Sequence, residues 1–402
     1  MDLSRILVRI TAGLMLATLA ACGGGGDGGG GGGTTAVVYS GVTSAAAITT
    51  TNASTITANV VGSDDASAII GGISVESSNV TQNQGTGPAE LARRLGRILR
   101  DVAVRVKQGA STQQVAPGVL VPVNDVLACD FGGSMKITGS IDDVTGLGTL
   151  TVTFVDCVFL VGFTINGPST WRIDGFDVFN LIPTDLTMSF ARLMLRGAGL
   201  SIDAGGSIRF QEIGNTETIT MNLDEINNNT GKMRKTVNLV IDTVILSPTS
   251  FNQTLTGQVY HSDFGYVDVT TVTPFFFGTL NQLFPDSGQI LLTGAPEGGG
   301  NRAIRVTALA SPPAALPATL VRLSLDLDGN GAFEINDVRL KWTDLGGPVG
   351  ADLGDNEPDG MHNSWETFYG LDPDVDDAAG NNDGDGSDNL AEYLAGTNPN
   401  VP

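Results

Sequence analysis

Polar and apolar residues alternate over most of the chain between Gly118 and Thr307. The segments "TETITMNLDEI" and "KTVNLVIDTVIL" show this period of two, and Gly, Asn and Asp residues separate such segments. A period of two is typical of strands with one buried and one wetted face, and short polar connections favour antiparallel neighbours. We therefore predict a mainly β fold: a large antiparallel meander, built as a curved sheet, a sandwich or a partial barrel.

One amphipathic helix is predicted near residues 88–101, where Pro88 and Glu90 provide a helix start. The apolar residues on one face are Leu91, Leu95, Ile98, Leu99 and Val102, and Arg93, Arg94, Arg97 and Arg100 lie elsewhere on its surface. We favour packing on the sheet with a solvated outer face over a basic face for lipid headgroups or an acidic partner. The earlier stretch "NASTITANVVG" has a strand-like composition, although short helical turns would also fit. The β domain is expected over residues 35–320.

The N-terminal residues have the features of an export signal and a lipid anchor. An apolar stretch at residues 10–20 follows two arginines and is too short for a membrane span. The residues Leu19-Ala20-Ala21-Cys22 resemble the lipobox of bacterial lipoproteins, which implies a signal peptide at 1–21 and lipidation of Cys22. A glycine run follows, so residues 22–34 are expected to be a lipidated Cys and a flexible tether. By the same resemblance, Gly23 favours the outer membrane or cell surface.

The chain is strongly acidic, with a formal net charge of −22 at pH 7. Removal of the signal peptide takes away Asp2, Arg5 and Arg9, which together carry one positive charge, and leaves a mature chain of −23. A body of this charge repels phosphate backbones, which argues against a nucleic acid partner. The same charge offers many sites for cations.

Two cysteines remain beyond the N-terminal region. Cys129 and Cys157 stand in the segments "ACDFGGSMKITGS" and "LTVTFVDCVFLVGF", which have the pattern of strands. In an exported protein, an even pair of cysteines is most simply a disulfide. Two buried free thiols are the alternative, because sequence alone does not prove a pairing.

Residues that commonly carry catalysis are few. The chain has two histidines, His261 and His362, and no HExxH, GxSxG or Walker-type motif. His261, Ser262 and Asp263 are consecutive, so on a strand they point to alternate faces and cannot form a triad. We expect a structural, solvent-facing His261 and no zinc site. The sequence leans against an enzyme, although a pair of distant carboxylates, as in glycosidases, leaves no local signature.

Three acidic stretches near the C-terminus follow the twelve-position pattern of an EF-hand loop: "DLDGNGAFEIND", "DNEPDGMHNSWE" and "NNDGDGSDNLAE". Oxygen-bearing side chains fall at positions 1, 3, 5, 9 and 12, glycine permits a sharp turn at 6, and position 7 offers its carbonyl. Ca²⁺ takes about six to eight hard oxygens, which alternate positions of a tight loop bring to one point. The predicted ligands are Asp326, Asp328, Asn330, Ala332, Glu334 and Asp337 in the first loop; Asp355, Glu357, Asp359, Met361, Asn363 and Glu366 in the second; and Asn381, Asp383, Asp385, Ser387, Asn389 and Glu392 in the third. The entry to the first loop, "LVRLSLD", has a strand pattern, so this loop is expected to extend from the β domain.

The last part of the chain also resembles a known family. The matching elements are Asp359-Gly360-Met361, Trp365-Glu366, Gly370-Leu371-Asp372-Pro373, Asp383-Gly384-Asp385-Gly386 and Glu392-Tyr393-Leu394-Ala395-Gly396-Thr397. Over roughly residues 352–400 the chain is similar to the thrombospondin type 3-like, calcium-binding repeats of bacterial exported proteins. This resemblance implies a small module with Ca²⁺ as its cofactor, which we expect over residues 321–402. The chain departs from the family at Asn381, usually Asp, and at His362, often Pro.

These features predict a calcium-binding lipoprotein of the bacterial cell envelope with a structural, adhesive or binding role at the surface. Its expected partners are the membrane, through the lipid anchor, and a polysaccharide or another envelope protein. Two alternatives belong to other classes: a secreted carbohydrate-active hydrolase with an accessory calcium module, and an envelope carrier of lipids or lipoproteins. A cleft with two carboxylates would favour the hydrolase, and a dry internal cavity would favour the carrier.

Overall fold

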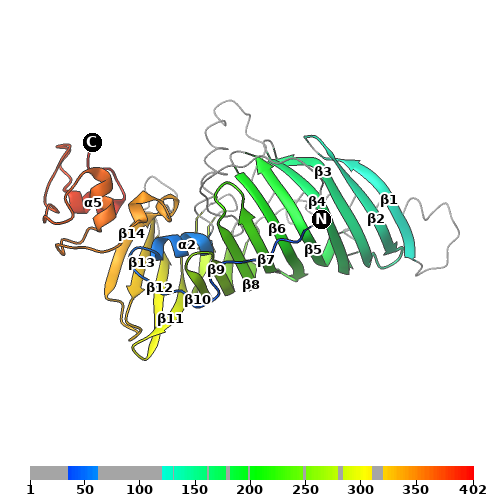
Figure 1. Ribbon diagram of the computed structural model, residues 1–402, viewed down its shortest axis with the longest axis horizontal. Coiled ribbons are helices and arrows are strands. Elements are labelled where there is room, and N and C mark those ends of the chain that lie inside the picture. The colour runs from blue at the N-terminus through cyan, green and yellow to red at the C-terminus, as the bar shows by residue number, and fades with distance from the viewer. Residues whose placement is uncertain are drawn as a thin grey trace. The chain divides into compact units, whose positions relative to one another are not determined.

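The computed structural model describes residues 35–61, 120–129, 131–160, 163–177, 182–197, 200–247, 250–278, 284–309 and 320–402. Within these ranges the chain is mainly β, with 14 strands whose order in the sheet follows their order in the sequence (Figure 1). The described residues fall into two compact units. The first contains those up to Ser40 and from Leu120 to Ser247, and the second contains Gly41 to Val61 and those from Ser250 onwards. Cys22 and the helix predicted near residues 88–101 lie outside the described residues.

The first unit is an antiparallel meander that curves along its length (Figure 1). Its strands are β1 (Leu120–Ala128), β2 (Ser134–Asp142), β3 (Gly148–Leu160), β4 (Phe163–Asp177), β5 (Ile182–Gly197), β6 (Leu200–Ile213), β7 (Thr216–Asn227) and β8 (Met233–Ile245). Buried and half-buried side chains alternate along the whole of β7. One face therefore forms a core, in which Trp171, Leu150 and Ile241 are fully buried. The predicted mainly β meander is confirmed, in its curved-sheet form.

A disulfide joins Cys129, which directly follows β1, to Cys157 in β3. The two Cα atoms are 5.5 Å apart, and the bond closes a separation of 28 residues. Both cysteines are buried. The predicted pairing is confirmed, and it ties the first strand of the meander to the third.

The second unit continues with strands β9 (Phe251–His261), β10 (Gly265–Phe277), β11 (Ser287–Glu297), β12 (Gly300–Ala308), β13 (Leu320–Asp326) and β14 (Ile335–Lys341). These strands pair antiparallel, each with the next. The C-terminal segment (residues 342–402) follows β14 and holds the short helices η2 (Trp342–Asp344), η3 (Pro348–Gly350), α5 (Asn363–Tyr369) and α6 (Asn389–Ala395). The N–H of Arg339 in β14 donates to the hydroxyl of Tyr393, and its guanidinium donates to the carbonyl of Leu394. The C-terminal segment is therefore fastened to the last strand.

Residues Ala53–Val61 form helix α2, although the composition of this stretch is typical of a strand. Ile56 and Val60, one turn apart, are buried together, so a helix buries these β-branched residues as well as a strand would. The hydroxyl of Thr57 donates to the carbonyl of Ala53 at 2.8 Å, and the side chain of Asn52 fixes the entry through Thr49 and Ala47. Tertiary contacts thus override the local preference. One such contact runs from the N–H of Gly346 to the hydroxyl of Ser54 at 3.0 Å.

Candidate metal centre

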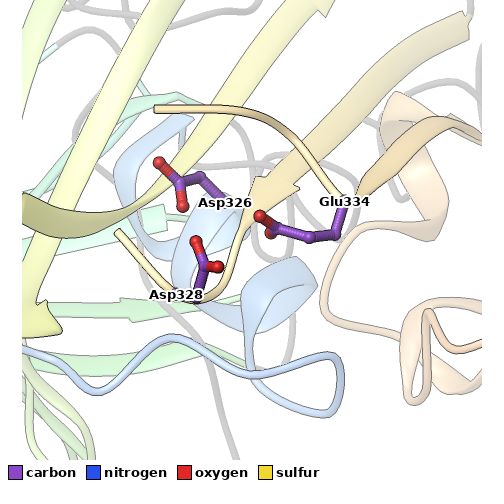
Figure 2. A group of neighbouring side chains, drawn as sticks. All are labelled: Asp326, Asp328 and Glu334. Carbon is purple, nitrogen blue, oxygen red and sulfur yellow. The ribbon is translucent and has the colours of Figure 1, made fainter. Parts of the chain in front are cut away.

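The first acidic loop connects β13 to β14, as the strand pattern of its entry predicts. Asp326 is the last residue of β13, and Asp328 and Glu334 follow in the loop. Each offers a carboxylate oxygen, and the three oxygens lie within 4.8 Å of one another. Figure 2 shows the three side chains beside one another. Three of the six predicted ligands are therefore brought together.

Hydrogen bonds from the backbone shape this loop. Asp326 is buried, and its two carboxylate oxygens accept the N–H groups of Gly329 at 2.7 Å and Gly331 at 2.8 Å. Gly331 has a φ of 85°, a left-handed conformation that glycine adopts without strain, at position 6 as the pattern requires. The side-chain oxygen of Asn330 accepts the N–H of Ala332 at 2.6 Å. These contacts hold the carboxylates of the loop close together.

Asp337, the predicted ligand at position 12, does not join this cluster. Its carboxylate forms ion pairs with Arg322 at 3.5 Å and with Arg339 at 3.2 Å. The reason is that β14 begins at Ile335, so position 12 lies within a strand, where its neighbours are the arginines of β13 and β14. The loop pattern could not predict these two ion pairs, because Arg322 and Arg339 both lie outside its twelve positions.

The second loop brings together more carboxylates than its pattern contains. Oxygens of Asp355, Glu357 and Asp359 lie within 4.8 Å of one another, and so do oxygens of Asp359, Glu366 and Asp377. Asp359 belongs to both groups. Asp377 is a site residue that the sequence did not predict, because it lies eleven positions beyond the end of the loop at Glu366.

Glu366 and Glu357 carry buried oxygens without a hydrogen-bond partner. Glu366 has 0% of its surface exposed, and neither of its carboxylate oxygens accepts a hydrogen bond; both oxygens of Glu357 are likewise buried and unpartnered. Burial, together with the neighbouring charge of Glu357, raises the pKa of Glu366 to about 9. Burial also raises the pKa of Glu357. Such groups are costly without a counter-charge, which a cation between them would supply.

Asn363, the predicted ligand at position 9 of the second loop, is engaged elsewhere. Its amide nitrogen donates to Asp352 and to Asn356, both at 3.2 Å, and its side-chain oxygen accepts the N–H of Asn356 at 3.1 Å. Met361 has a buried side chain, and its N–H donates to Asp359. Asn363 therefore organises the loop and is not part of the carboxylate groups.

The third loop has the same local hydrogen bonds, but its carboxylates are less closely gathered. Side-chain oxygens of Asn381, Asp383 and Asp385 accept the N–H groups of Gly384, Asp385 and Ser387. Glu392 and Asn389 are both buried. One carboxylate oxygen of Glu392 and the side-chain oxygen of Asn389 have no hydrogen-bond partner. Among the described residues, the groups with carboxylate oxygens within 4.8 Å come from the first and second loops and Asp377. The third loop is the weaker candidate.

The second and third loops are two copies of one loop–helix unit. Helix α5 begins at Asn363 and α6 at Asn389, each at position 9 of its loop and 26 residues apart. Both helices end at a left-handed glycine, Gly370 with a φ of 80° and Gly396 with a φ of 71°. The helix carries position 12 inward, which explains why Glu366 and Glu392 are both buried although they belong to acidic surface loops.

Both histidines are buried. His261 was expected to face solvent, but it is 7% exposed, stacks on Phe264 and accepts the N–H of Asp263, so this expectation is wrong. His362 is buried, which lowers its pKa to about 4 and keeps the ring neutral. Its Nε2–H donates to the carbonyl of Val349 at 2.8 Å, so its Nδ1 accepts from the hydroxyl of Tyr393 at 3.0 Å.

No protein family, curated protein or solved structure matches the chain. Within the described residues, no helix combines the length and apolar character that a membrane crossing requires. The functional argument therefore depends on the geometry of the acidic groups.

Proposed function

We propose that this chain is a calcium-binding protein of the bacterial cell envelope, in which Ca²⁺ holds the acidic C-terminal segment in its folded arrangement. The observation that carries the proposal is Glu366, which is fully buried with both carboxylate oxygens unpartnered beside Asp359 and Asp377. Three ionised carboxylates this close repel one another, and the repulsion is relieved either by a proton or by a bound cation; a cation would contact several of these oxygens at once.

The donors favour calcium over other metals. All members of the three groups are carboxylates, and hard oxygen ligands suit Ca²⁺, Mg²⁺ or Mn²⁺ rather than zinc or copper. The loops provide main-chain carbonyls as well, and Ca²⁺ tolerates the irregular, many-oxygen geometry that Mg²⁺ does not. From Asp326 onward the chain has 18 acidic residues and two basic ones, Arg339 and Lys341, so several cations would relieve a large self-repulsion.

The envelope location is supported by the lipobox-like residues up to Cys22 and by the glycine run that follows. Outside the cell Ca²⁺ is abundant, and extracellular modules commonly bind it with dissociation constants of about 10⁻⁴–10⁻³ M. Weak sites would therefore be filled, and the role of the ions would be structural. A Cys22→Ser variant should leave the membrane fraction and lose palmitate labelling; unchanged fractionation would contradict the anchor.

Calorimetric titration of the chelator-treated chain with CaCl₂ tests the calcium function. Glu366→Gln removes the charge of the buried carboxylate and keeps its shape, so it should weaken or abolish one class of binding site. Asp344→Asn is a suitable control, because it removes the same charge from a position between the first and second loops. The absence of any Ca²⁺ heat in the parent chain would overturn the proposal.

A further inference from the structure

Asp377 lies outside the twelve positions of every acidic loop, yet its carboxylate faces the second loop. One oxygen of Asp377 lies within 4.8 Å of oxygens of both Asp359 and Glu366. Its Oδ1 is buried and has no hydrogen-bond partner, like both oxygens of the fully buried Glu366. Two carboxylates from different segments thus direct unpartnered oxygens into one place.

The short distance between the carboxylates of Asp377 and Glu366 is not a consequence of their spacing in the sequence. Glu366 is in helix α5, whereas Asp377 follows that helix in the linker to the third loop. A linker of this kind could place its carboxylate in water at lower cost, because exposed charges keep their hydration. Asn363, which the pattern assigns to the same site, has its amide turned to Asp352 and Asn356. One ligand position of the second loop is therefore left to another residue.

We propose that Asp377 is a ligand of the divalent cation held by the second loop, in the place that the loop pattern gives to Asn363. This inference rests on the proposed calcium function and adds to it a ligand from outside the loop. The cation then closes a ring of chain from Asp359 to Asp377 that contains all of α5.

The same residue connects the second loop to the third. The carbonyl of Asp377 accepts the side-chain amide of Asn389 at 2.8 Å and the N–H of Gly380 at 2.8 Å. Asn389 is 1% exposed, and its own side-chain oxygen is unpartnered at position 9 of the third loop. A cation that fixes Asp377 therefore fixes the start of the third loop, and we expect occupancy of the second loop to strengthen binding at the third.

The test compares Asp377→Asn with Asp376→Asn in the full chain, by calorimetric titration with CaCl₂. Asp376 is adjacent to Asp377 and is exposed. Its substitution by Asn removes the same charge, so this variant controls for the change in net charge. Mutation of a residue that merely supports a metal ligand typically weakens metal binding about 10–100-fold. Asp377→Asn, which changes a ligand itself, should therefore weaken Ca²⁺ binding at the second loop at least about tenfold. Asp376→Asn should have no comparable effect. Asp377→Glu restores a carboxylate and should recover part of the affinity. Trp365, which precedes Glu366 in α5, provides a fluorescence signal local to the site, and near-UV circular dichroism at saturating Ca²⁺ confirms the fold of each variant.

The outcomes separate this inference from the calcium function itself. If Glu366→Gln loses a site while Asp377→Asn binds like Asp376→Asn, Asp377 is not a ligand, and the calcium function stands. If the parent chain binds no Ca²⁺, both fail. If Asp377→Asn weakens the second site and leaves the third unchanged, the ligand assignment holds and the link through Asn389 is overturned.

Discussion

At the scale of single residues, the buried carboxyl of Glu217 gives a prediction for pH. Glu217 in β7 is 8% exposed with one oxygen unpartnered, and burial, followed by the charge of Glu212, raises its pKa to about 8. The folded chain therefore keeps this proton between about pH 4.5 and 8, where the unfolded chain has lost it. The contribution of Glu217 to stability is present below about pH 4.5 and is lost as the pH rises through 8.

Glu217→Gln should accordingly remove a decline in unfolding free energy of up to about 1.4 kcal/mol per pH unit within that window. The variant should be more stable than the parent at pH 9 and similar to it near pH 4. Urea unfolding of the two chains at pH 5, 7 and 9 measures the difference. Glu212→Gln is a useful companion, because loss of its charge should end the decline at a lower pH. Parallel pH profiles for Glu217→Gln and the parent would contradict the assignment.

Asp337 and Glu334 give a second prediction at this scale. Asp337 is paired with Arg322 and Arg339, whereas Glu334 lies with Asp326 and Asp328. Asp337→Asn should leave Ca²⁺ binding at the first loop within about twofold and cost no more than about 1 kcal/mol of stability, because the pairs are partly exposed. Glu334→Gln should weaken binding clearly more. Calorimetry decides between them, and the reverse order of effects would restore the EF-hand assignment of position 12.

The sequence could predict which carboxylates gather within the first loop, but not which carboxylates from different segments meet. Asp326, Asp328 and Glu334 come together as the pattern implies, since a tight loop brings alternate residues together locally. The positions of three other side chains depend on distant parts of the chain. Asp337 pairs with an arginine of β14, Asn363 bonds to Asp352, and Asp377 is brought to Glu366 by the course of the linker. Those are tertiary contacts, which a twelve-position spacing does not contain.

At the scale of elements, strands were predictable and short helices were not. The alternation in "TETITMNLDEI" reappears as alternating burial along β7, because one face of that strand must be dry. Helix α2 forms although its sequence is rich in β-branched residues. Nine residues give only a weak periodic signal for a helix or a strand, and tertiary packing decides between the two. Helices α5 and α6 have seven residues each and could not have been separated from the loops that precede them.

The docking of α6 onto β14 gives a prediction for an element. The hydroxyl of Tyr393 accepts the N–H of Arg339 at 3.0 Å and donates to Nδ1 of His362, and the tyrosine is 2% exposed. Tyr393→Phe leaves a buried donor and a buried acceptor without partners, which should cost about 1–3 kcal/mol. Thermal unfolding of the variant at saturating Ca²⁺ should show the second unit melting earlier. If Tyr393→Phe melts with the parent, the Tyr393 hydroxyl does not contribute to the docking of α6 on β14, and the contact between Arg339 and Leu394 together with apolar packing accounts for it.

At the scale of the whole molecule, the disulfide and the carboxylate groups lie in different units. The disulfide between Cys129 and Cys157 lies in the first unit, and all three carboxylate groups lie in the second. The even number of cysteines after Cys22 predicted the bond. The division at residues 249–250 falls within the alternating region, where strand continues after strand, so the sequence gives no composition change to mark it.

Chelation and reduction should therefore act on different units. Closing a loop of 28 residues stabilises by about 3–4 kcal/mol in the chain-entropy model, so a reductant should lower the stability of the first unit. A ligand at about 100 times its dissociation constant adds about 2.7 kcal/mol, which EGTA would remove from the second unit. Limited proteolysis with mass spectrometry, with each agent alone and with both, locates the cleavages. EGTA should open sites in residues 342–402 and also near α2, because Thr50 and Ser54 are hydrogen bonded to Leu353 and Gly346. Reductant should open sites in β1–β3. Equal cleavage of β1–β3 by EGTA alone would show that the cations support the whole chain and not the second unit.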